Sequence, residues 1–522
     1  MNMTDYEATR RSFRLQVPAD FEYARDVVGG WAARQPGKVA LVAVGPDGAT
    51  RREITFSDLA RGSNRFANAL AGLGVAAGEM ALVMLPRIPE WHEALLGLFR
   101  AGVVALPGTM LLTARDVEHR LVASEAALAI VDEEGAQKVL AVRDRCPSLR
   151  HLIVVGGRPD AGTLEYAQLL ARASDREPPA RPTSKDDPLL VYFTSGTVAE
   201  PKTVLHTHAS YGAGHEVTAR FWQDLTPDDL HWTVSDTGWA KAAWGMIFGQ
   251  WIVGARVFVW DQRGRLDPDQ LLRVLASHGV TTFCAPPTLY RALVQQDLGA
   301  HDLSRVRHAV AAGEPLNPEV IRHFRETVEL PIGDGYGQTE TGAITGMRPD
   351  DDDPGKDGSM GRPLPGIETR VHDGELHVKP ETVPSFFSGF LGEEPFAGEW
   401  WQTGDEVRED EDGYLWFEGR DDDIILTAGY RVGPFEVESA LVSHPAVAEA
   451  AAVASPDEER GSVVKAFVVL RDGEPSDRLA AELQEHVKRV TAPYKYPRIV
   501  EFAANLPQTP SGKIKRAELR AR

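Results

Sequence analysis

The chain has 522 residues, which is long for one ordinary hydrophobic core, so we expect at least two domains. Hydrophobic residues make up 43% and charged residues 25%, and no run approaches the ~18 uninterrupted apolar residues that suggest a membrane span. The formal net charge of −20 argues against general affinity for nucleic acid, because such binding depends on Lys and Arg side chains that neutralise phosphates.

The first half of the chain alternates helical patterns with short apolar runs, which indicates βαβ units. The predicted elements in this half are helices over Phe56–Leu73 and Trp91–Ala101 and strands over Ala81–Leu85, Val103–Leu106 and Leu128–Val131. A polar stretch, Ala173–Asp187, contains three prolines and is typical of a surface connection. A buried strand is predicted directly after it, over Leu189–Phe193.

The same alternation continues in the middle of the chain. Strands are predicted over Val257–Trp260 and Thr281–Ala285, and a helix over Asp267–Ser277 begins with Asp267 as its cap and Pro268 in its first turn. Beyond about Asp350 the sequence becomes rich in Gly, Pro and Asp, with short alternating runs such as Thr369–Val378 that predict a small β subdomain. The last hundred or so residues predict a separate α+β module.

One local signal stands directly after the strand Leu189–Phe193. Backbone amides, hydroxyl groups and one ammonium group in such a loop can surround phosphate oxygens. A polar turn between two strands is the alternative, and the closing Pro-Lys pair favours the phosphate loop. The segment reads Thr194, Ser195, Gly196, Thr197, Val198, Ala199, Glu200, Pro201, Lys202.

A second signal, Gly333 to Thr341, also follows an apolar strand. Tyr336 could stack on a base, Thr339 could bond a phosphate, and Glu340 could hold the Mg²⁺ that accompanies ATP. A glycine-rich turn without a ligand is the alternative. The position after a strand of a parallel sheet favours a site, because ligands gather at the carboxyl ends of such strands.

Sequence signatures of other nucleotide-binding proteins and of hydrolases are missing. Three further segments that could belong to a site lie closer to the C-terminus. There is no Walker A loop, no dinucleotide-binding GxGxxG, no GxSxG elbow and no HExxH. Only two cysteines, Cys146 and Cys284, are present, far apart, so neither a disulfide framework nor a zinc site is expected. The further segments are Trp401–Asp405, Gly419–Arg431 and Pro510–Lys515.

In combination these segments resemble the adenylate-forming superfamily, which contains acyl-CoA synthetases, adenylation domains of peptide synthetases, and luciferases. The resemblance covers roughly Asp26 to Arg522. Within the superfamily, Tyr192–Lys202 with His206, then Ser235–Trp239 and Ala492–Arg498, are most similar to the medium-chain acyl-CoA synthetases. The implied fold is α/β: a large N-terminal domain over residues 1–421, made of two α/β subdomains and a small β subdomain, and a small mobile α+β domain over residues 422–522.

The resemblance also implies a role for individual residues. Lys513 would be the catalytic lysine, Asp422 the hinge between the domains, and Glu340 the ligand of Mg²⁺. The phosphates of ATP would meet Thr194, Ser195, Gly196, Thr197, Lys202, Thr339 and Arg431. The adenine would meet Gly313, Glu314, Pro315, Asp334, Gly335 and Tyr336, and the ribose Asp405 and Arg420. Coenzyme A would meet Ala428, Gly429, Tyr430, Arg460 and Lys488, and the acyl chain Trp239 and Gly337.

The chemistry expected of such a site is activation of a carboxylic acid by ATP to an acyl-adenylate, followed by transfer of the acyl group to coenzyme A. Both charge stabilisation and positioning are needed, because a carboxylate attacks the negatively charged α-phosphate. The family loop usually carries Thr or Ser and then Gly where this chain has Val198 and Ala199. How this loop closes over the β and γ phosphates therefore stays open.

Gly337 bears on the size of the acid. Acetate-specific relatives carry a Trp at this position, so a glycine predicts room for a medium-chain or branched acid. The alternative is that the glycine serves turn geometry alone. Gly337→Trp is predicted to shift preference toward acetate or propionate if the first interpretation holds.

The alternative functions are a stand-alone adenylation enzyme that loads a carrier protein and a catalytically silent protein that binds ATP or acyl-adenylate. Small-molecule substrates are expected as partners, with no nucleic acid and no integral membrane association. Acylation of the Lys513 amine would remove its charge and is a hypothesis for regulation. Because the N-terminus lacks the apolar core of a signal peptide, a cytoplasmic location is expected.

Overall fold

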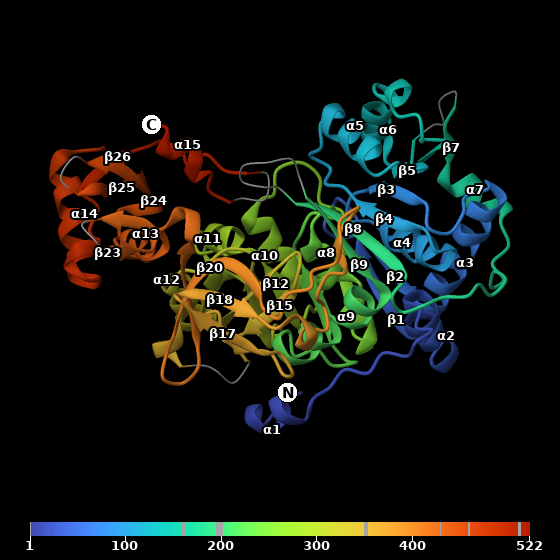
Figure 1. Cartoon of the computed structure of the whole chain (residues 1–522), viewed down its shortest axis with the longest axis horizontal. Helices are drawn as coiled ribbons and strands as arrows, with labels where there is room; N and C mark the ends of the chain where they lie inside the picture. The colour runs from blue at the N-terminus through green and yellow to red at the C-terminus, as the bar shows by residue number, and fades with distance from the viewer. Residues whose placement is uncertain are drawn as a thin grey trace.

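The computed structural model describes residues 2–157, 162–194, 202–348, 353–427, 430–457, 460–509 and 513–522. Within these ranges the chain forms a large domain around two mainly parallel sheets, a small antiparallel sheet, and a C-terminal domain at one end of the molecule (Figure 1). The predicted α/β class and the division into a large and a small part are therefore confirmed. No helix in the described ranges is long and apolar enough to cross a membrane.

The first large sheet contains five consecutive parallel pairings, and its strands at both edges run antiparallel to their neighbours. Parallel strands that are buried on both faces have sequences of consecutive apolar residues, and Val257–Trp260 in β11 is such a sequence. Its order in the described chain is β16 (Arg362–Pro363), β15 (Gly342–Gly346), β14 (Ile332–Gln338), β13 (His308–Ala312), β12 (Thr282–Ala285), β10 (Leu230–Thr233), β11 (Arg256–Trp260), β1 (Val39–Val44) and β2 (Arg51–Thr55).

The second large sheet is parallel from β8 to β7, and β9 returns antiparallel to β8. The order is β19 (Gly389–Phe390), β9 (Lys202–Thr207), β8 (Pro188–Thr194), β4 (Val104–Pro107), β3 (Met80–Met84), β5 (Leu128–Val131), β6 (His151–Val154) and β7 (Leu164–Glu165). One apolar core cluster contains buried residues from both large sheets, including Leu41, Val83 and Val257, so the two sheets pack as one domain.

Helices cover the two sheets, and their caps follow the sequence signals. Thr55 caps α3 in a reciprocal capping box with Asp58, and Asp267 caps α10 with Pro268 at its first position, as predicted. The helices of the large domain are α1 (Tyr6–Ser12), α2 (Gly30–Arg34), α3 (Phe56–Gly72), α4 (Pro89–Ala101), α5 (Ala114–Ala123), α6 (Glu133–Leu140), α7 (Tyr166–Arg172), α8 (Ala240–Met246), α9 (Phe248–Ile252), α10 (Pro268–Ser277), α11 (Pro287–Leu293) and α12 (Pro318–Val328).

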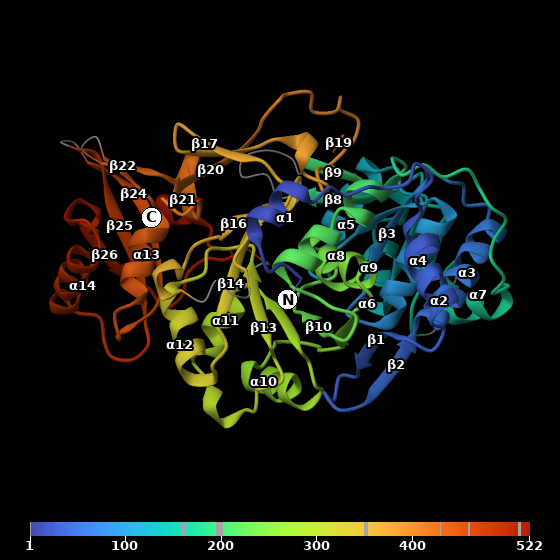
Figure 2. The ribbon, with the colours of Figure 1, turned by 90° about the horizontal axis from the view of Figure 1, so that it is seen from below.

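The small β subdomain predicted beyond residue 350 is an antiparallel sheet of β17 (Thr369–His372), β18 (Glu375–Val378), β20 (Trp401–Glu409) and β21 (Leu415–Arg420). A short turn of 3₁₀ helix, Asp421–Asp423, follows β21 and leads into the C-terminal domain. Figure 2 shows this sheet on the opposite side of the large domain from α10.

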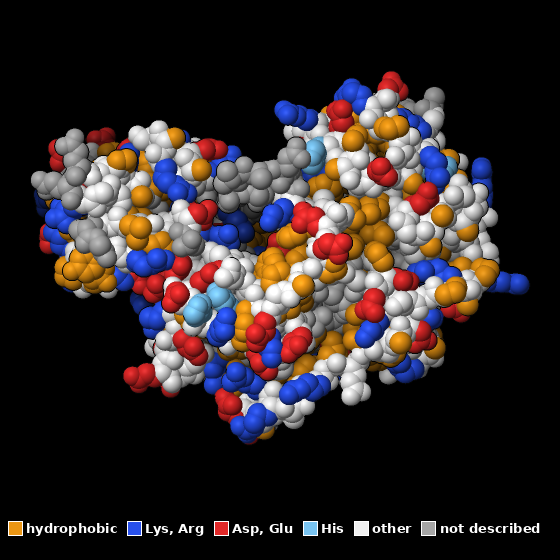
Figure 3. All heavy atoms as spheres, viewed as in Figure 1, with side chains coloured by type: hydrophobic (Ala, Val, Ile, Leu, Met, Phe, Trp, Pro, Cys, Tyr) orange, Lys and Arg blue, Asp and Glu red, His pale blue; other side chains and the backbone are white. Residues whose placement is uncertain are grey.

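The C-terminal domain has apolar clusters of its own, built from described residues between Ile425 and Leu519. Its elements are β22 (Ile425–Thr427), β23 (Tyr430–Val432), α13 (Pro434–Val442), β24 (Val447–Asp457), β25 (Gly461–Leu470), α14 (Asp477–Val490), β26 (Ile499–Phe502) and α15 (Arg516–Arg520). Acidic and basic side chains are interspersed on the face of the molecule drawn in Figure 3, with no single-sign field.

Candidate active site

The carboxyl ends of β12, β13 and β14 meet at one edge of the first large sheet, because these strands are parallel neighbours. Ala312 pairs with Gly335 in the register of β13 and β14, so Gly313 and the residues that follow lie beside Gly335 and Tyr336. The residues predicted to meet adenine are therefore brought together from two strands. This edge is where open α/β sheets bind ligands.

Glu314 is held in place from α11. The Thr288 hydroxyl donates to both carboxylate oxygens of Glu314 at 2.7 and 2.8 Å, and Arg291 donates to one of them at 2.9 Å. Gly313 has a φ of +103°, a conformation that favours glycine. The Gly-Glu-Pro loop is thus fixed by backbone geometry and by two side chains of a neighbouring helix.

The carboxyl group of Asp334 is buried at the same edge. It accepts hydrogen bonds from the backbone N–H of Gly335 at 2.9 Å and of Leu316 at 3.3 Å. Burial raises the pKa of Asp334 to about 8. A Cβ at Gly335 would lie 2.5 Å from the Trp222 ring, so this glycine is required by packing as well.

A second group of polar side chains lies where β14 faces the small β subdomain. The Tyr336 hydroxyl donates to the Asp405 carboxylate, which also accepts from Gln338 at 2.9 Å and from Arg420 at 3.2 Å. Asp405 and Arg420 pair directly in the register of β20 and β21. The structure therefore joins the predicted ribose residues to Tyr336 in one network.

The predicted phosphate loop connects β8 to β9. Thr194 ends β8, Lys202 begins β9, and the Thr194 hydroxyl donates to the Lys202 carbonyl at 3.3 Å. Ser195, Gly196, Thr197, Val198 and Ala199 lie outside the described residues. The two strands are antiparallel neighbours, so Thr194 and Lys202 lie side by side at the end of this strand pair.

His206 ties this strand pair to the second predicted loop. Its Nε2 lies 2.8 Å from the Thr339 carbonyl and its Nδ1 lies 3.3 Å from the Ser210 hydroxyl. Burial lowers the pKa of His206 to about 3. The ring is therefore neutral near pH 7, and since a carbonyl only accepts, Nε2 carries the proton that it donates to Thr339.

Glu340 follows Thr339 and is half-buried. Burial raises the pKa of its carboxyl group, and the positive charges of Lys202 and Arg420 partly counteract that shift. Within the described part of the chain, the Glu340 carboxylate forms no ion pair. A carboxylate in this condition suits a divalent cation, and Mg²⁺ prefers oxygen ligands.

Trp239 precedes α8, and Gly337 lies near the end of β14 beside an irregularity in its pairing with β15. A Cβ at Gly337 would lie 1.9 Å from the Gly342 carbonyl oxygen and 2.8 Å from the Ala343 Cα. The contact involves backbone atoms, so a side chain could enter only if β15 moved. The structure thus supports the turn-geometry interpretation of this glycine, and Gly337→Trp is not a clean test of acyl pocket size.

The residues predicted in the C-terminal domain are dispersed over it and do not form one cluster among the described residues. Arg431 forms an ion pair with the buried Glu406 of β20 at 2.8 Å, which links the C-terminal domain to the large one. Tyr430 is exposed and stacks on Tyr494 at 4.4 Å between ring centroids. Exposed Arg460 and half-buried Lys488 lie elsewhere on the domain. Asp422 lies in the 3₁₀ turn, and Ala428 and Gly429 are outside the described residues.

Lys513 faces the nucleotide-binding edge of the large domain. Its ammonium group is near enough to Lys241 to lower the pKa of that lysine, although burial is the larger cause and nearby acids act in the opposite direction. The Lys241 ammonium donates to the Ala312 carbonyl at the end of β13. Lys513, the predicted catalytic lysine, and the Gly313 loop are therefore both near Lys241, although they are distant in the sequence.

Sequence reasoning gave no role to Lys241, Gln338 or Glu406, and named His206 only as part of the resemblance. Gln338 could have been found, because it lies inside the glycine-rich segment that contains Tyr336 and Glu340. Lys241 and Glu406 carried no signal of their own, since only the packing of α8 and β20 brings them to the site.

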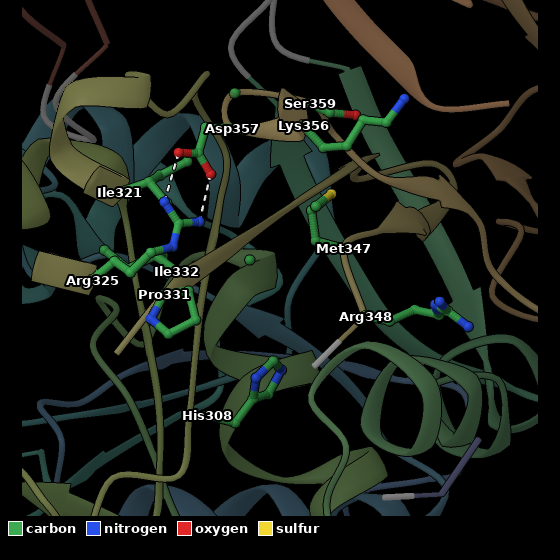
Figure 4. Close-up of a pocket in the computed structure, with 12 residues that line it drawn as sticks. His308, Ile321, Arg325, Pro331, Ile332, Met347, Arg348, Lys356, Asp357 and Ser359 are labelled. Carbon is green, nitrogen blue, oxygen red and sulfur yellow. Dashed lines mark hydrogen bonds and ion pairs between the residues drawn. The ribbon is translucent and has the colours of Figure 1, made fainter. Parts of the chain in front are cut away.

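A separate pocket lies at the amino ends of β13 and β14, where His308 and Ile332 line it (Figure 4). Its cavity of about 20 Å³ has room for one water molecule. Its Arg325 is held by two hydrogen bonds to Asp357, at 2.8 and 2.7 Å. This pocket is too small for a nucleotide or an acyl group.

Comparisons with known proteins agree with this geometry. The chain matches the family model of the AMP-binding enzyme over residues 29–393 and that of the AMP-binding enzyme C-terminal domain over residues 436–513. The chain belongs to the AMP-binding enzyme family. The resemblance to adenylate-forming enzymes is confirmed, and so is the predicted class of AMP-forming acyl-CoA synthetase.

Several relatives of this AMP-binding enzyme match it along almost its whole length. It is 40% identical to the mitochondrial acyl-coenzyme A synthetase ACSM3 of Mus musculus over 99% of this chain and 93% of the relative. It is 41% identical to the mitochondrial ACSM4 of Rattus norvegicus, over 100% and 93%. The structure of the anthranilate CoA ligase AuaEII with anthranoyl-AMP matches with a TM-score of 0.88 and 30% identity, over 97% and 98%.

The expected cytoplasmic location is contradicted by these relatives. ACSM3, ACSM4 and ACSM5 are all mitochondrial by name. The prediction was wrong because it depended on the missing apolar core of a signal peptide, a criterion that addresses secretion and does not distinguish the cytosol from an organelle.

Proposed function

We propose that this AMP-binding enzyme activates a medium-chain or branched fatty acid and transfers it to coenzyme A. The carboxylate oxygen attacks the α-phosphorus of ATP, and the bond from that phosphorus to the bridging oxygen breaks, so pyrophosphate leaves. The thiolate of coenzyme A then attacks the acyl carbon of the acyl-adenylate. The acyl–oxygen bond to phosphate breaks, and AMP leaves as the second product.

The observation that supports the proposal is the proximity of Lys513 to Lys241, whose ammonium group donates to the Ala312 carbonyl at the end of β13. Asp334, Tyr336 and the Gly313 loop would bind the adenine, with Asp405 and Arg420 at the ribose. Thr194, Lys202 and Thr339 would bind phosphates together with Ser195, Gly196 and Thr197. The Lys513 ammonium would stabilise the charge that develops as the carboxylate attacks.

Glu340 would hold Mg²⁺, which supplies charge neutralisation for the triphosphate when bound. Its half-buried carboxylate, without an ion pair among described residues, supports this assignment. Trp239 would border the acyl chain. Coenzyme A would approach along Gly429, Ala428 and Tyr430 toward Arg460 and Lys488.

Rotation of residues 422–522 about Asp422 would separate the two steps. No apolar cluster contains described residues from both sides of the 3₁₀ turn, which supports a domain boundary there. Lys513 would face the nucleotide only in the first step, because the second step needs no cation on the α-phosphate once pyrophosphate has left. Arg431, now paired with Glu406, would exchange this partner as the domain turns.

The test is the lysine variant assayed in two halves. Lys513→Ala should lower acid-dependent pyrophosphate release from MgATP by at least about a hundredfold, the effect of losing one well-placed electrostatic group. Acyl-CoA formation from preformed acyl-adenylate and coenzyme A should stay within a few-fold of wild type. Equal losses in the two assays would refute the assignment of Lys513 to the first step.

The identity of the acid is tested separately, with a panel of acids in the presence of coenzyme A. An aromatic acid is the second candidate, favoured by the likeness to the anthranilate CoA ligase along the whole chain. The proposal expects the highest kcat/KM for acids of medium length or with a branch. A clear preference for benzoate or anthranilate over hexanoate and octanoate would replace it with the aromatic candidate.

A further inference from the structure

The segment that contains β19 connects β9 to the turn that carries Glu340. β19 pairs antiparallel with β9, which begins at Lys202 (Figure 2). Just before β19, the Phe387 N–H donates to the Glu340 carbonyl at 2.8 Å, and the Ser385 hydroxyl donates to the Thr341 carbonyl at 2.6 Å. One short stretch of chain therefore binds both the strand of the proposed phosphate lysine and the turn of the proposed Mg²⁺ ligand.

The ring of Phe390, the last residue of β19, faces the Lys202 side chain. The Lys202 Nζ lies over this ring, 4.8 Å from its centroid, which is within the range where the negative face of an aromatic ring attracts a cation. Lys202 is exposed, and its ammonium group forms no ion pair with any described residue. The attraction to the ring therefore restricts a flexible side chain that no carboxylate holds.

The Phe390 ring belongs to an aromatic cluster that reaches the proposed ribose site. Its centroid lies 5.0 Å from that of the buried Phe387 ring, which in turn lies 5.2 Å from the Trp401 ring. The Trp401 Nε1–H donates to Gln338 at 3.1 Å, and Gln338 donates to the Asp405 carboxylate at 2.9 Å. The ring that faces Lys202 is thus fixed by the same packed groups that lie at the ribose end of the site.

An aromatic ring suits this position because it attracts an ammonium group without neutralising its charge. A carboxylate that could compete for Lys202 is that of Glu340, whose pKa the Lys202 charge lowers in part, yet the two groups form no ion pair in the described part of the chain. A direct pair would weaken the attraction of Lys202 for phosphate and that of Glu340 for Mg²⁺. With Lys202 over the ring, both charges stay available for MgATP.

We propose that Phe390 is a positioning residue, whose ring holds the Lys202 ammonium at the start of β9 for the phosphates of ATP and apart from the Glu340 carboxylate. The inference rests on the proposed function, in which Lys202 meets phosphate and Glu340 holds Mg²⁺. Phe390 itself touches none of the reacting atoms. Its effect is on the binding of MgATP, so it acts on KM for MgATP and leaves kcat unchanged.

The sharpest test changes the charge distribution of the ring and leaves its shape almost unaltered. Pentafluorophenylalanine at position 390 lacks the negative ring face and should raise KM for MgATP roughly two- to fivefold, the effect of one cation–π contact at an exposed site. The kcat for acid-dependent pyrophosphate release should stay at the wild-type value. Phe390→Leu should give the same rise in KM, whereas Phe390→Tyr, which keeps a ring face, should behave as wild type.

Phe396→Leu is the matched control. Phe396 belongs to the same aromatic cluster, with its ring 5.1 Å from that of Trp401, and no Lys or Arg lies over it among the described residues. Its replacement should leave KM for MgATP unchanged. An equal rise of KM in Phe396→Leu and Phe390→Leu would show that the cluster acts through packing alone and would overturn the inference.

A double-mutant cycle assigns the effect to the lysine. In the Lys202→Ala background, Phe390→Leu should change KM for MgATP no further, because the ring then has no cation to hold. The same rise of KM in both backgrounds would overturn the inference. So would a rise in Phe390→Leu that the fluorinated enzyme does not share, since the fluorinated ring preserves the packing.

Lys202→Ala alone separates this inference from the proposed function. It should raise KM for MgATP by at least about tenfold, the effect of losing a hydrogen bond to a charged group. An unchanged KM in this variant rejects the assignment of Lys202 to the phosphates. A raised KM in Lys202→Ala, together with wild-type KM in both Phe390→Leu and the fluorinated enzyme, rejects the role of the ring and leaves the phosphate assignment standing.

Discussion

At the scale of single residues, the site depends on buried polar groups that bond to one another and so fix its loops. His206 is the clearest case, because one neutral imidazole joins the strand that follows the phosphate loop to the carbonyl of Thr339. The ring also packs on Tyr211, with 3.8 Å between centroids. Its role is to position the turn that carries Glu340.

His206→Phe keeps the ring stacking but leaves the Thr339 carbonyl without its donor, which costs about 1–3 kcal/mol for a buried group. We expect KM for MgATP to rise by roughly five- to 150-fold, since about 1.4 kcal/mol corresponds to a factor of ten. The effect should be constant from pH 6 to 8, because the His206 pKa of about 3 keeps the ring neutral throughout.

Tyr192→Phe is the control for this prediction. The Tyr192 hydroxyl is buried and has no hydrogen-bond partner among the described residues, so its removal should leave KM for MgATP unchanged. An unaltered KM in His206→Phe, or an equal change in both variants, would contradict the positioning role.

At the scale of secondary-structure elements, the hairpin of β14 and β15 shows how close packing selects glycine. A Cβ at Gly346 would lie 2.4 Å from the Trp222 ring, and one at Gly337 would meet the backbone of Gly342. The glycines of the segment that was predicted to bind a ligand are therefore also needed because a larger side chain would not fit there. Tyr336 and Glu340 belong to this hairpin, so the backbone conformation of the hairpin determines where their side chains lie.

Gly337→Ala tests this interpretation with the smallest possible side chain. We expect the free energy of unfolding to fall by about 1–3 kcal/mol, the usual cost of forcing extra atoms into a packed region. The kcat/KM values for short and long acids should fall by a common factor. Denaturant unfolding and an acid panel measure the two effects.

Gly72→Ala is the matched control, since a Cβ there would have no neighbour within 4 Å. It should be neutral or slightly stabilising. A Gly337→Ala enzyme of wild-type stability whose preference moves toward acetate would instead restore the pocket interpretation made from the sequence.

At the scale of the whole molecule, buried histidines tie stability to pH. Burial lowers the pKa of His92 to about 4, of His208 to about 4 and of His231 to about 3, as it does for His206. The unfolded chain binds protons at these rings below pH 6.5, whereas the folded chain does not. Their contribution to stability is therefore present above pH 6.5 and is lost as the pH falls toward 4.

We expect the free energy of unfolding to fall by at least about 3 kcal/mol between pH 7 and pH 5, because each such ring can contribute about 1.4 kcal/mol per pH unit. Urea unfolding at a series of pH values measures the slope. His92→Phe should reduce it, whereas His372→Gln, at an exposed ring, should not. A stability that is flat over this range would contradict the prediction.

The sequence by itself determined the fold class, most of the strands and helices, and the segments that bear the site. Apolar periodicity reports directly on burial, and glycine, proline and capping residues report on local backbone geometry, so α3, α10 and β8 were predicted within one or two residues of their ends. The same local logic made Tyr336 and Glu340 candidates for the site, whereas Lys513 became a candidate only through the resemblance of the combined segments to a known family.

Only the tertiary structure decided which residues share the site without a local signal. Lys241 reaches the Ala312 carbonyl and His206 reaches the Thr339 carbonyl, across separations of 71 and 133 residues. The reason is physical. A sequence pattern records what each segment buries, whereas a contact between distant segments depends on how strand order and helix packing bring them together.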